Sequence, residues 1–185
     1  MWVSSLILIA TYAAIMSEKV NRAIVSLLGA GIMILLGVLN QEMAIRGVDF
    51  NTIALLTGMM IIVSVTRKSG VFQYVAIWSA KQVKANPAGI LLMLQVVTAV
   101  FSAFLDNVTT VLLIVPVTLV ICEELKIKPY PILVAEIFAS NIGGTATLIG
   151  DPPNIIIGSA TGLTFNDFVY NLTPVIIVVQ IVTAA

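Results

Sequence analysis

A helix cannot run unbroken through residues 140–157 (SNIGGTATLIGDPPNIII), although apolar residues flank this segment on both sides. Pro152 and Pro153 donate no backbone hydrogen bond, and the pair Gly143-Gly144 weakens the helix that precedes them. Backbone left unpaired at membrane depth persists only where protein or a water-filled cavity surrounds it. The segment therefore predicts a discontinuous membrane helix with a polar site at its break.

The composition indicates a membrane protein. Hydrophobic residues make up 59% of the chain and charged residues 10%, whereas average soluble domains have about 25% charged residues. This predicts an all-α polytopic protein whose surroundings are the lipid bilayer. The net charge is zero, which gives no reason to expect nucleic acid or another polyanion as a partner.

The residue types present exclude several kinds of chemistry for this chain. It contains no histidine and a single cysteine, Cys122, so a His/Cys metal cluster, a disulfide framework and a histidine-based triad are not expected. We find no nucleotide-binding fingerprint and no nucleophile–base pair, so neither ATP-driven pumping nor an enzyme is predicted. No cofactor is expected beyond sodium or a proton as a coupling ion.

The apolar runs define the expected spans: 3–16, 23–39, 52–66, 88–105, 108–122, 132–149, 155–163 and 175–185. Residues 1–66 are predicted to form three scaffold-like transmembrane helices. The first is short, and we expect it to extend toward Val20 while Lys19 reaches the membrane surface. The last run, 174–185, is expected to be the start of a truncated transmembrane helix.

The segment 67–86 is predicted to be an amphipathic helix lying on the cytoplasmic membrane surface, with an ordinary loop helix as the alternative. Apolar residues recur there at helical spacing, beside four basic residues and no acid. The positive-inside rule places this segment and loop 17–22 in the cytoplasm, and loop 40–50 outside. The amino terminus is then external, in the plasma (inner) membrane.

The segment 88–122 is too long for one helix and is interrupted at Asp106-Asn107. Two full crossings and a re-entrant hairpin with Asp106-Asn107 at its tip both fit the charge pattern. We favour the hairpin, because the second arm, residues 108–122, is short for a crossing of about 20 residues. Segment 131–165 then runs outward as the broken transmembrane helix.

Asp106, Glu136 and Asp151 lie in apolar stretches without a neighbouring lysine or arginine. A carboxylate at the bilayer centre costs roughly 2.5–3.5 kcal/mol, so a proton, a cation or converging amides must offset it. Asp106 and Asp151 also stand where helix caps are expected. Capping and function are compatible, because helix amino ends stabilise an anion, and the carboxyl ends expected near Leu105 and Ile149 offer carbonyls to a cation.

Other residues beside the breaks have both structural and functional interpretations. Glu136 shares a helix face with Ser140 and could relay a proton or cation, or it could snorkel to water from near the cytoplasmic end. Gly143-Gly144 is either a hinge, which the prolines favour, or a helix-packing surface. Threonines in membrane helices more often bond their own backbone than a ligand. The threonines concerned are Thr109, Thr110, Thr145 and Thr147.

The chain resembles the ion transporter superfamily in two strings, SAFLDNVTTVLLIVPVTLVICEEL at 102–125 and AEIFASNIGGTATLIGDPPNIIIGSATG at 135–162. This superfamily contains arsenite permeases, D-type sodium–proton antiporters, the P protein, and citrate and dicarboxylate carriers. The resemblance covers about residues 50–175 and is greatest to the P-protein and arsenical-pump branch. It implies two inverted repeats, each with a re-entrant hairpin and a broken helix, in a homodimer. This chain contains one such repeat and the start of the next section.

The resemblance also implies which residues bind the ion or substrate. At the hairpin tip these are Asp106, Asn107, Thr109 and Thr110. At the broken helix they are Ser140, Asn141, Gly143, Gly144, Thr145, Gly150, Asp151, Pro152, Pro153 and Asn154. A bound sodium ion would have as ligands Asp106, Asn107, Asn141 and Asp151, and no other metal is implied.

The expected function is secondary active transport of a small inorganic ion, as a sodium–proton antiporter or an arsenite/antimonite permease. Dicarboxylate carriers have Ser-Asn-Thr at the hairpin tip, whereas the carboxylate of Asp106 would repel a di- or tricarboxylate. A citrate or dicarboxylate carrier is therefore the alternative, favoured by the helix amino ends. A third hypothesis is a non-transporting remnant or partner subunit, because one repeat supplies only half of the expected site.

Overall fold

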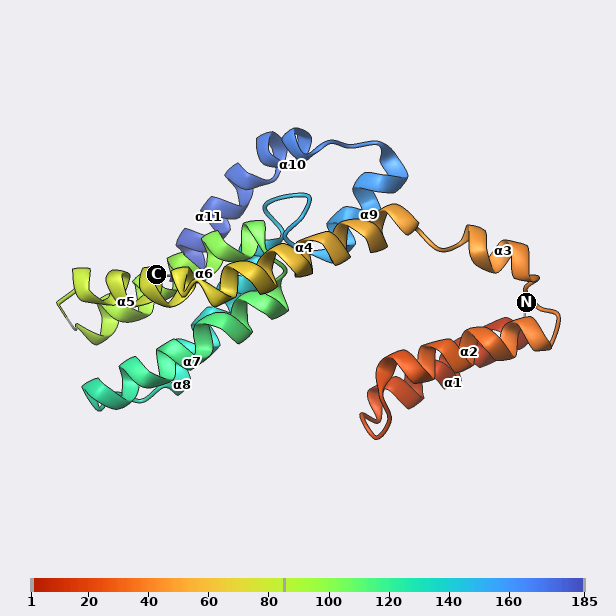
Figure 1. The fold of residues 1–185 in the computed structure, drawn as a ribbon, viewed down its shortest axis with the longest axis horizontal. Helices are drawn as coiled ribbons and strands as arrows, with labels where there is room; N and C mark the ends of the chain where they lie inside the picture. The colour runs from red at the N-terminus through yellow and green to blue at the C-terminus, as the bar shows by residue number, and fades with distance from the viewer. Residues whose placement is uncertain (1, 85, 185) are drawn as a thin grey trace. The chain divides into compact units, whose positions relative to one another are not determined.

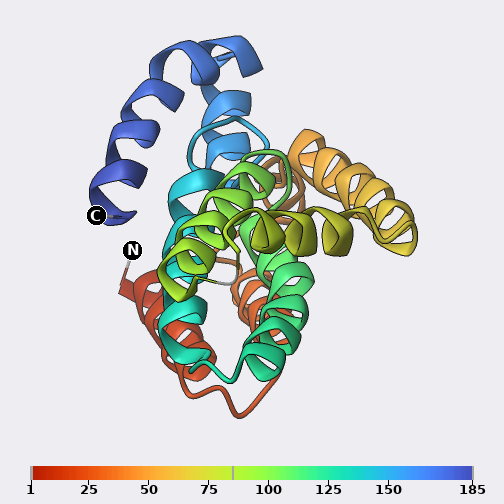
Figure 2. The ribbon, with the colours of Figure 1, turned by 90° about the vertical axis from the view of Figure 1, so that its left-hand side faces the viewer.

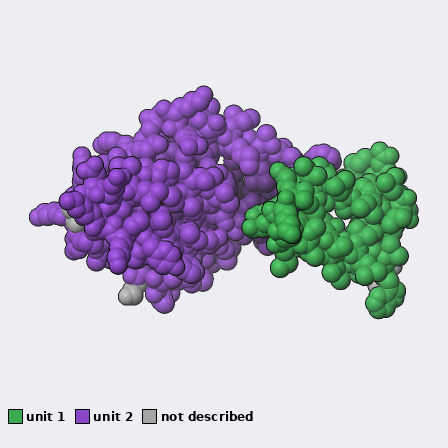
Figure 3. Space-filling model, turned by 90° about the horizontal axis from the view of Figure 1, so that it is seen from below, with its two compact units in different colours: residues 1–49 green, residues 50–185 purple. Residues whose placement is uncertain are grey.

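The structure is a computed structural model that describes residues 2–84 and 86–184, and the regular elements in these ranges are helices. Two compact units make up the chain, residues 1–49 and 50–185 (Figure 3). Three described helices are long and apolar enough to cross a membrane: Phe50–Lys68, Pro87–Phe104 and Asn107–Leu125. A fourth candidate is the pair Phe165–Asn171 and Thr173–Ala184, bent by 48°. The prediction of an all-α polytopic membrane protein is confirmed.

The first unit contains the apolar helices α1 (Trp2–Met16) and α2 (Arg22–Leu35). They have 15 and 14 residues, fewer than the roughly 20 that one crossing takes. The expected extension of α1 toward Val20 is wrong. The helix ends at Met16 because the Ser17 hydroxyl bonds the Ala14 carbonyl and Glu18 adopts a left-handed φ of 54°.

A short helix, α3 (Gln41–Arg46), occupies the segment 40–50 that the sequence reading treated as a loop. Asn40 caps it, with its side-chain oxygen accepting from the Met43 amide at 2.7 Å. An exposed ion pair between Glu42 and Arg46, at 2.7 Å, spans its one turn. Local capping and charge pairing thus form a helix that hydropathy does not detect.

The described residues of the second unit form eight helices, of which α6, α7 and α8 pack on one another (Figure 1). Its core lies between these three helices and α5, around Ile90, Leu94, Ile114 and Ile132. The bounds are α4 (Phe50–Lys68), α5 (Val71–Gln82), α6 (Pro87–Phe104), α7 (Asn107–Leu125), α8 (Tyr130–Gly144), α9 (Pro152–Thr161), α10 (Phe165–Asn171) and α11 (Thr173–Ala184).

Helix α5 forms where an amphipathic helix was expected, and it has two apolar sides. Phe72 is buried and meets the ring of Phe101 edge to face at 5.1 Å between centroids, while Ala76 is buried in the core. Tyr74 and Trp78 are exposed. Its buried side anchors α5 to α6 and α7, and its exposed aromatic side suits a membrane surface, where the helix remains predicted to lie.

Helix α7 is longer than the sequence predicted. It starts directly after Asp106 and continues through Pro116 and two glutamates until Lys126 turns the chain with a φ of 56°. With 19 residues it is long enough to cross a membrane, so the shortness of the second arm was a wrong reason to favour a hairpin. Hydropathy missed the ends because polar capping residues and glutamates extend the helix beyond its apolar run.

Candidate functional site

The turn between α6 and α7 is fixed by a cap at Asp106. One oxygen of its carboxylate accepts from the Thr109 amide at 2.9 Å, and the other accepts from the Thr109 hydroxyl. Asn107, the first residue of α7, turns its amide group toward Asn141 of α8. The expected cap at Asp106 is therefore present, and it sets the position of the next two polar side chains.

The break between α8 and α9 comprises residues 145–151. Helix α8 ends at Gly144, so the expected carboxyl end near Ile149 is wrong by more than a turn. Asn154 explains the difference, because its side-chain amide donates to the carbonyls of Thr145 (3.1 Å) and Thr147 (2.8 Å). These bonds pair backbone that would otherwise be unsatisfied, and they hold the segment out of the helix.

Glycines allow the break to lie against the end of α6. A Cβ atom built on Gly143 would lie 2.6 Å from the Cα of Ala99, and one on Gly150 would lie 2.6 Å from the carbonyl oxygen of Ser102. Neither separation is compatible with a side chain at these positions. Gly143-Gly144 ends the helix and packs closely as well, so the hinge and packing interpretations describe the same two residues.

Hydrogen bonds join the break between α6 and α7 to the last turns of α8 in one polar network. The Ser102 hydroxyl donates to the Ser140 carbonyl at 2.7 Å and lies 3.2 Å from the Ser140 hydroxyl. The Ser140 hydroxyl donates to the Asn107 carbonyl at 2.8 Å, and the Asn107 amide donates to Asn141 Oδ1 at 3.1 Å. Segments more than 30 residues apart in the sequence are thus brought to one place, which we call the tip network.

Asp106 and Asp151 lie close enough for their charges to act on each other. Asp151 is the N-cap residue of α9, but its carboxylate forms no capping bond. Pro153 has no amide hydrogen, and the Asn154 amide bonds the backbone carbonyl of Asp151 at 3.0 Å instead. Within residues 2–84 and 86–184, no ion pair involves Asp106, Glu136 or Asp151.

Glu136 is fully buried, so the snorkelling interpretation is wrong. Its carboxylate accepts from the Thr118 hydroxyl on α7 instead of reaching water. Thr145, directly after α8, bonds the carbonyl of Asn141 in that helix, as the backbone-bonding interpretation expected. The remaining predicted site residues, Thr110, Pro152 and Pro153, make no side-chain contact to the tip network that the structure records.

Three contacts at the site were not predicted. Ser102 is fully buried in the tip network, Thr147 bonds the carbonyl of Ala103, and Thr173 of α11 bonds the carbonyl of Ala146 at 2.9 Å. Ser102 lies one turn before Asp106, which is the one sequence signal that could have identified it. The other two could not be found from spacing, because they join segments that the fold alone brings together.

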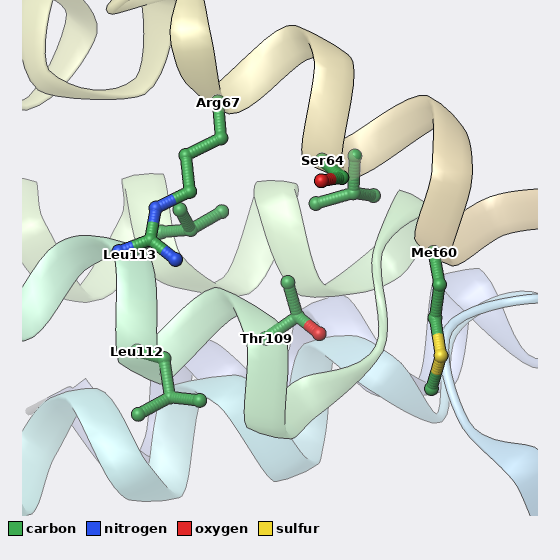
Figure 4. A pocket seen from close by; sticks show the side chains of 7 residues that line it. Met60, Ser64, Arg67, Thr109, Leu112 and Leu113 are labelled. Atoms are coloured by element: carbon green, nitrogen blue, oxygen red, sulfur yellow. The ribbon is translucent and has the colours of Figure 1, made fainter.

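A pocket of about 190 Å³ lies between α4 and α7 and reaches the tip through Thr109 (Figure 4). Arg67 extends from α4 toward α7 in this pocket, with Ser64 beside it on the same helix. A cationic side chain therefore lies near one edge of the site, although the sequence shows none beside the acids. The other residues that line the pocket are Met60, Val63, Leu112 and Leu113.

These helices and their breaks define a polytopic membrane protein with a polar network where α6, α7 and α8 meet. Residues 12–185 match the family model described as citrate transporter, and the chain belongs to that family. The match confirms the resemblance to the ion transporter superfamily. The matched family is one of transporters, not of enzymes.

Curated relatives cover nearly the whole chain. It is 55% identical over 183 residues to a 46 kDa membrane protein of Mycobacterium leprae and 51% identical over 183 residues to an uncharacterized transporter of Mycobacterium tuberculosis. Each alignment covers 97% of this chain and 43% of the relative. The human P protein is 41% identical over 162 residues, which are 85% of this chain and 19% of that protein. The chain thus spans less than half the length of these relatives.

Proposed function

We propose that this chain provides about half of a secondary active transporter for a small ion, with the ion site at the tip network. The observation that supports it best is the approach of Asp106 and Asp151 from two separate helix breaks, without an ion pair for either in the described chain. Two neighbouring carboxylates in an apolar surrounding repel each other. A cation or a proton between them removes this cost.

The groups around the acids suit a small cation such as sodium. Sodium prefers oxygen ligands, and the tip offers carboxylates at Asp106 and Asp151 and amide oxygens at Asn107 and Asn141. Asn141 Oδ1 accepts one hydrogen bond from Asn107 and retains a second lone pair for a ligand. The carboxyl ends of α6 and α8 add partial negative charge near these groups.

We further propose the architecture that the superfamily resemblance implies. Helices α6 and α7 form a re-entrant hairpin, α8 and α9 form one discontinuous transmembrane helix, and the second inverted repeat that the resemblance implies completes the site in a homodimer. The joined tip and break support this arrangement, because such contacts allow irregular backbone to persist at membrane depth. The transported ion is then sodium exchanged for protons, or arsenite or antimonite.

The second candidate is an organic-anion carrier. The family description is citrate transporter, the amino ends of α7 and α9 favour an anion, and Arg67 lies beside Thr109 in the neighbouring pocket. A tricarboxylate would still meet Asp106 and Asp151. Citrate would therefore need to enter with a cation that bridges its carboxylates to those of the protein.

The test uses the full-length protein in proteoliposomes, with sodium, arsenite and citrate (with and without a divalent cation) as probes. Asp106→Asn should lower uptake of the true substrate at least about tenfold, since about 1.4 kcal/mol of lost binding is a factor of ten. Glu124→Gln, at the exposed end of α7, is the matched control and should transport normally.

Each probe separates the candidates. Sodium or arsenite uptake that depends on Asp106 supports the ion transporter. Citrate uptake that requires the divalent cation and weakens in Arg67→Gln supports the organic-anion carrier. Uptake of a probe that is unchanged in Asp106→Asn would remove Asp106 from the site.

A further inference from the structure

Buried polar side chains lie in the packed helices α6, α7 and α8, in addition to those of the tip network. Each of these side chains is at most 2% exposed, although apolar residues surround them. We call them the polar seam: Gln95 and Thr98 of α6, Thr110 and Thr118 of α7, and Glu136 of α8.

Most of the seam is not satisfied by protein groups. Gln95 Oε1, the Thr98 and Thr110 hydroxyls and Glu136 Oε2 have no hydrogen-bond partner among residues 2–84 and 86–184. An unpaired buried polar group costs about 1–3 kcal/mol, so four of them together would strongly destabilise the folded protein. Internal water is the usual partner of such groups, at about three hydrogen bonds per molecule.

Two residues of the polar seam lie one helical turn from residues of the tip network. On α8, Glu136 lies one turn before Ser140, and on α6, Thr98 lies one turn before Ser102. One turn rises about 5.4 Å, and one water bridging two oxygens spans about 5.6 Å at normal hydrogen-bond lengths. The spacing of Glu136 and Ser140 along α8 is therefore similar to the span of one bridging water. On α7, Ile114 separates Thr110 from Thr118, so the path along α8 is the more direct.

The surroundings of Glu136 contain no cation that would hold it as a carboxylate. Helices α6 and α11, which pack on α8, have no ionisable side chain. Helix α7 contributes Cys122 near Glu136, and its glutamates 123 and 124 are exposed at its end. Among the residues that the structure describes, the one hydrogen bond recorded for this carboxylate comes from the hydroxyl of Thr118.

We propose that Glu136 binds and releases the proton that is exchanged in transport, and that water in the polar seam connects it to the tip network. In the release step the Glu136 O–H bond breaks, the carboxylate remains, and the proton passes to seam water as hydronium. This inference rests on the proposed function and specifies its coupling ion. It places the proton at a residue distinct from the acids of the ion site.

The experiment compares two transport modes of the full-length protein in proteoliposomes, using whichever of sodium, arsenite or citrate the wild type transports. Glu136→Gln should reduce uptake driven by a pH gradient to background while solute–solute exchange continues, because exchange needs no net proton movement. Glu136→Asp should restore part of the gradient-driven uptake, and Glu124→Gln should keep both modes. Asp106→Asn should lose both.

The possible results distinguish the two proposals. If the wild type moves none of the probes in either mode, the proposed function fails. If it transports and Glu136→Gln keeps gradient-driven uptake, or loses exchange equally, the role of Glu136 is refuted while the transporter remains. Infrared difference spectra on changing pH give a readout independent of transport. The wild type should show a carboxylic-acid carbonyl band that Glu136→Gln lacks, and identical difference spectra for the two proteins would also refute the proposal.

Discussion

At the scale of single residues, the glycines of the break are positions where one methyl group decides the packing. A Cβ on Gly143 would overlap backbone atoms of Ala99, which cannot move aside as the end of a flexible side chain can. Gly58, in the middle of α4, has open space around the same position. These two helical glycines therefore form a matched pair.

We expect Gly143→Ala to destabilise the protein by about 1–3 kcal/mol, the usual cost of overpacking, and to separate α8 from α6. Gly58→Ala should be neutral or stabilising by up to about 1 kcal/mol, because alanine favours a helix more than glycine does. Thermal unfolding of the detergent-solubilised protein measures both. Equal midpoints for the two variants would contradict the close approach of α8 and α6.

The two aspartates show how one sequence pattern leads to different roles. Both precede a helix, and both were expected to cap it. Asp106 caps through its side chain because Thr109 offers an amide and a hydroxyl. Asp151 is followed by two prolines, so its carboxylate stays free of capping bonds and is available to a ligand.

At the scale of elements, the break between α8 and α9 depends on Asn154. Its amide supplies two hydrogen bonds to carbonyls of the irregular segment, so this predicted site residue holds the backbone that shapes the site. The prolines prevent a continuous helix, and the asparagine determines where the irregular segment begins.

Asn154→Asp should destabilise the protein by roughly 1–3 kcal/mol per lost bond, because a carboxylate cannot donate to the two carbonyls. Asn171→Asp is the control, since Asn171 donates one exposed bond to the Asp167 carbonyl at 2.7 Å. The free energies of unfolding in denaturant can be compared directly. A similar decrease in the free energy of unfolding in both variants would mean that the hydrogen bonds of Asn154 do not stabilise the break.

At the scale of the whole molecule, the path of α6 and α7 through the membrane is the main prediction to test. Both helices are long enough to cross, so their lengths allow a hairpin or two crossings. The tip contacts α8 shortly before its break, which favours the hairpin because two irregular backbone segments then lie at one polar site.

Single cysteines placed at Leu105, Lys84 and Lys128, with Cys122 replaced by alanine, distinguish the two paths. For a hairpin entering from the cytoplasm, a bulky membrane-impermeant thiol reagent should label positions 84 and 128 from the cytoplasmic side and leave position 105 unlabelled from outside. Labelling of position 105 from outside, with 84 and 128 labelled from inside, would establish two crossings.

The sequence alone determined the membrane environment, the helical class and the places where helices break, because these follow from local hydropathy and from the backbone limits of glycine and proline. It also identified Asp106 as a cap, since capping involves residues close in the sequence. The tertiary structure decided which groups meet, namely Ser102 with Ser140 and Thr118 with Glu136, and it brought the charges of Asp106 and Asp151 near each other. Such contacts join helices far apart along the chain, and their partners depend on how those helices pack, which no local pattern specifies.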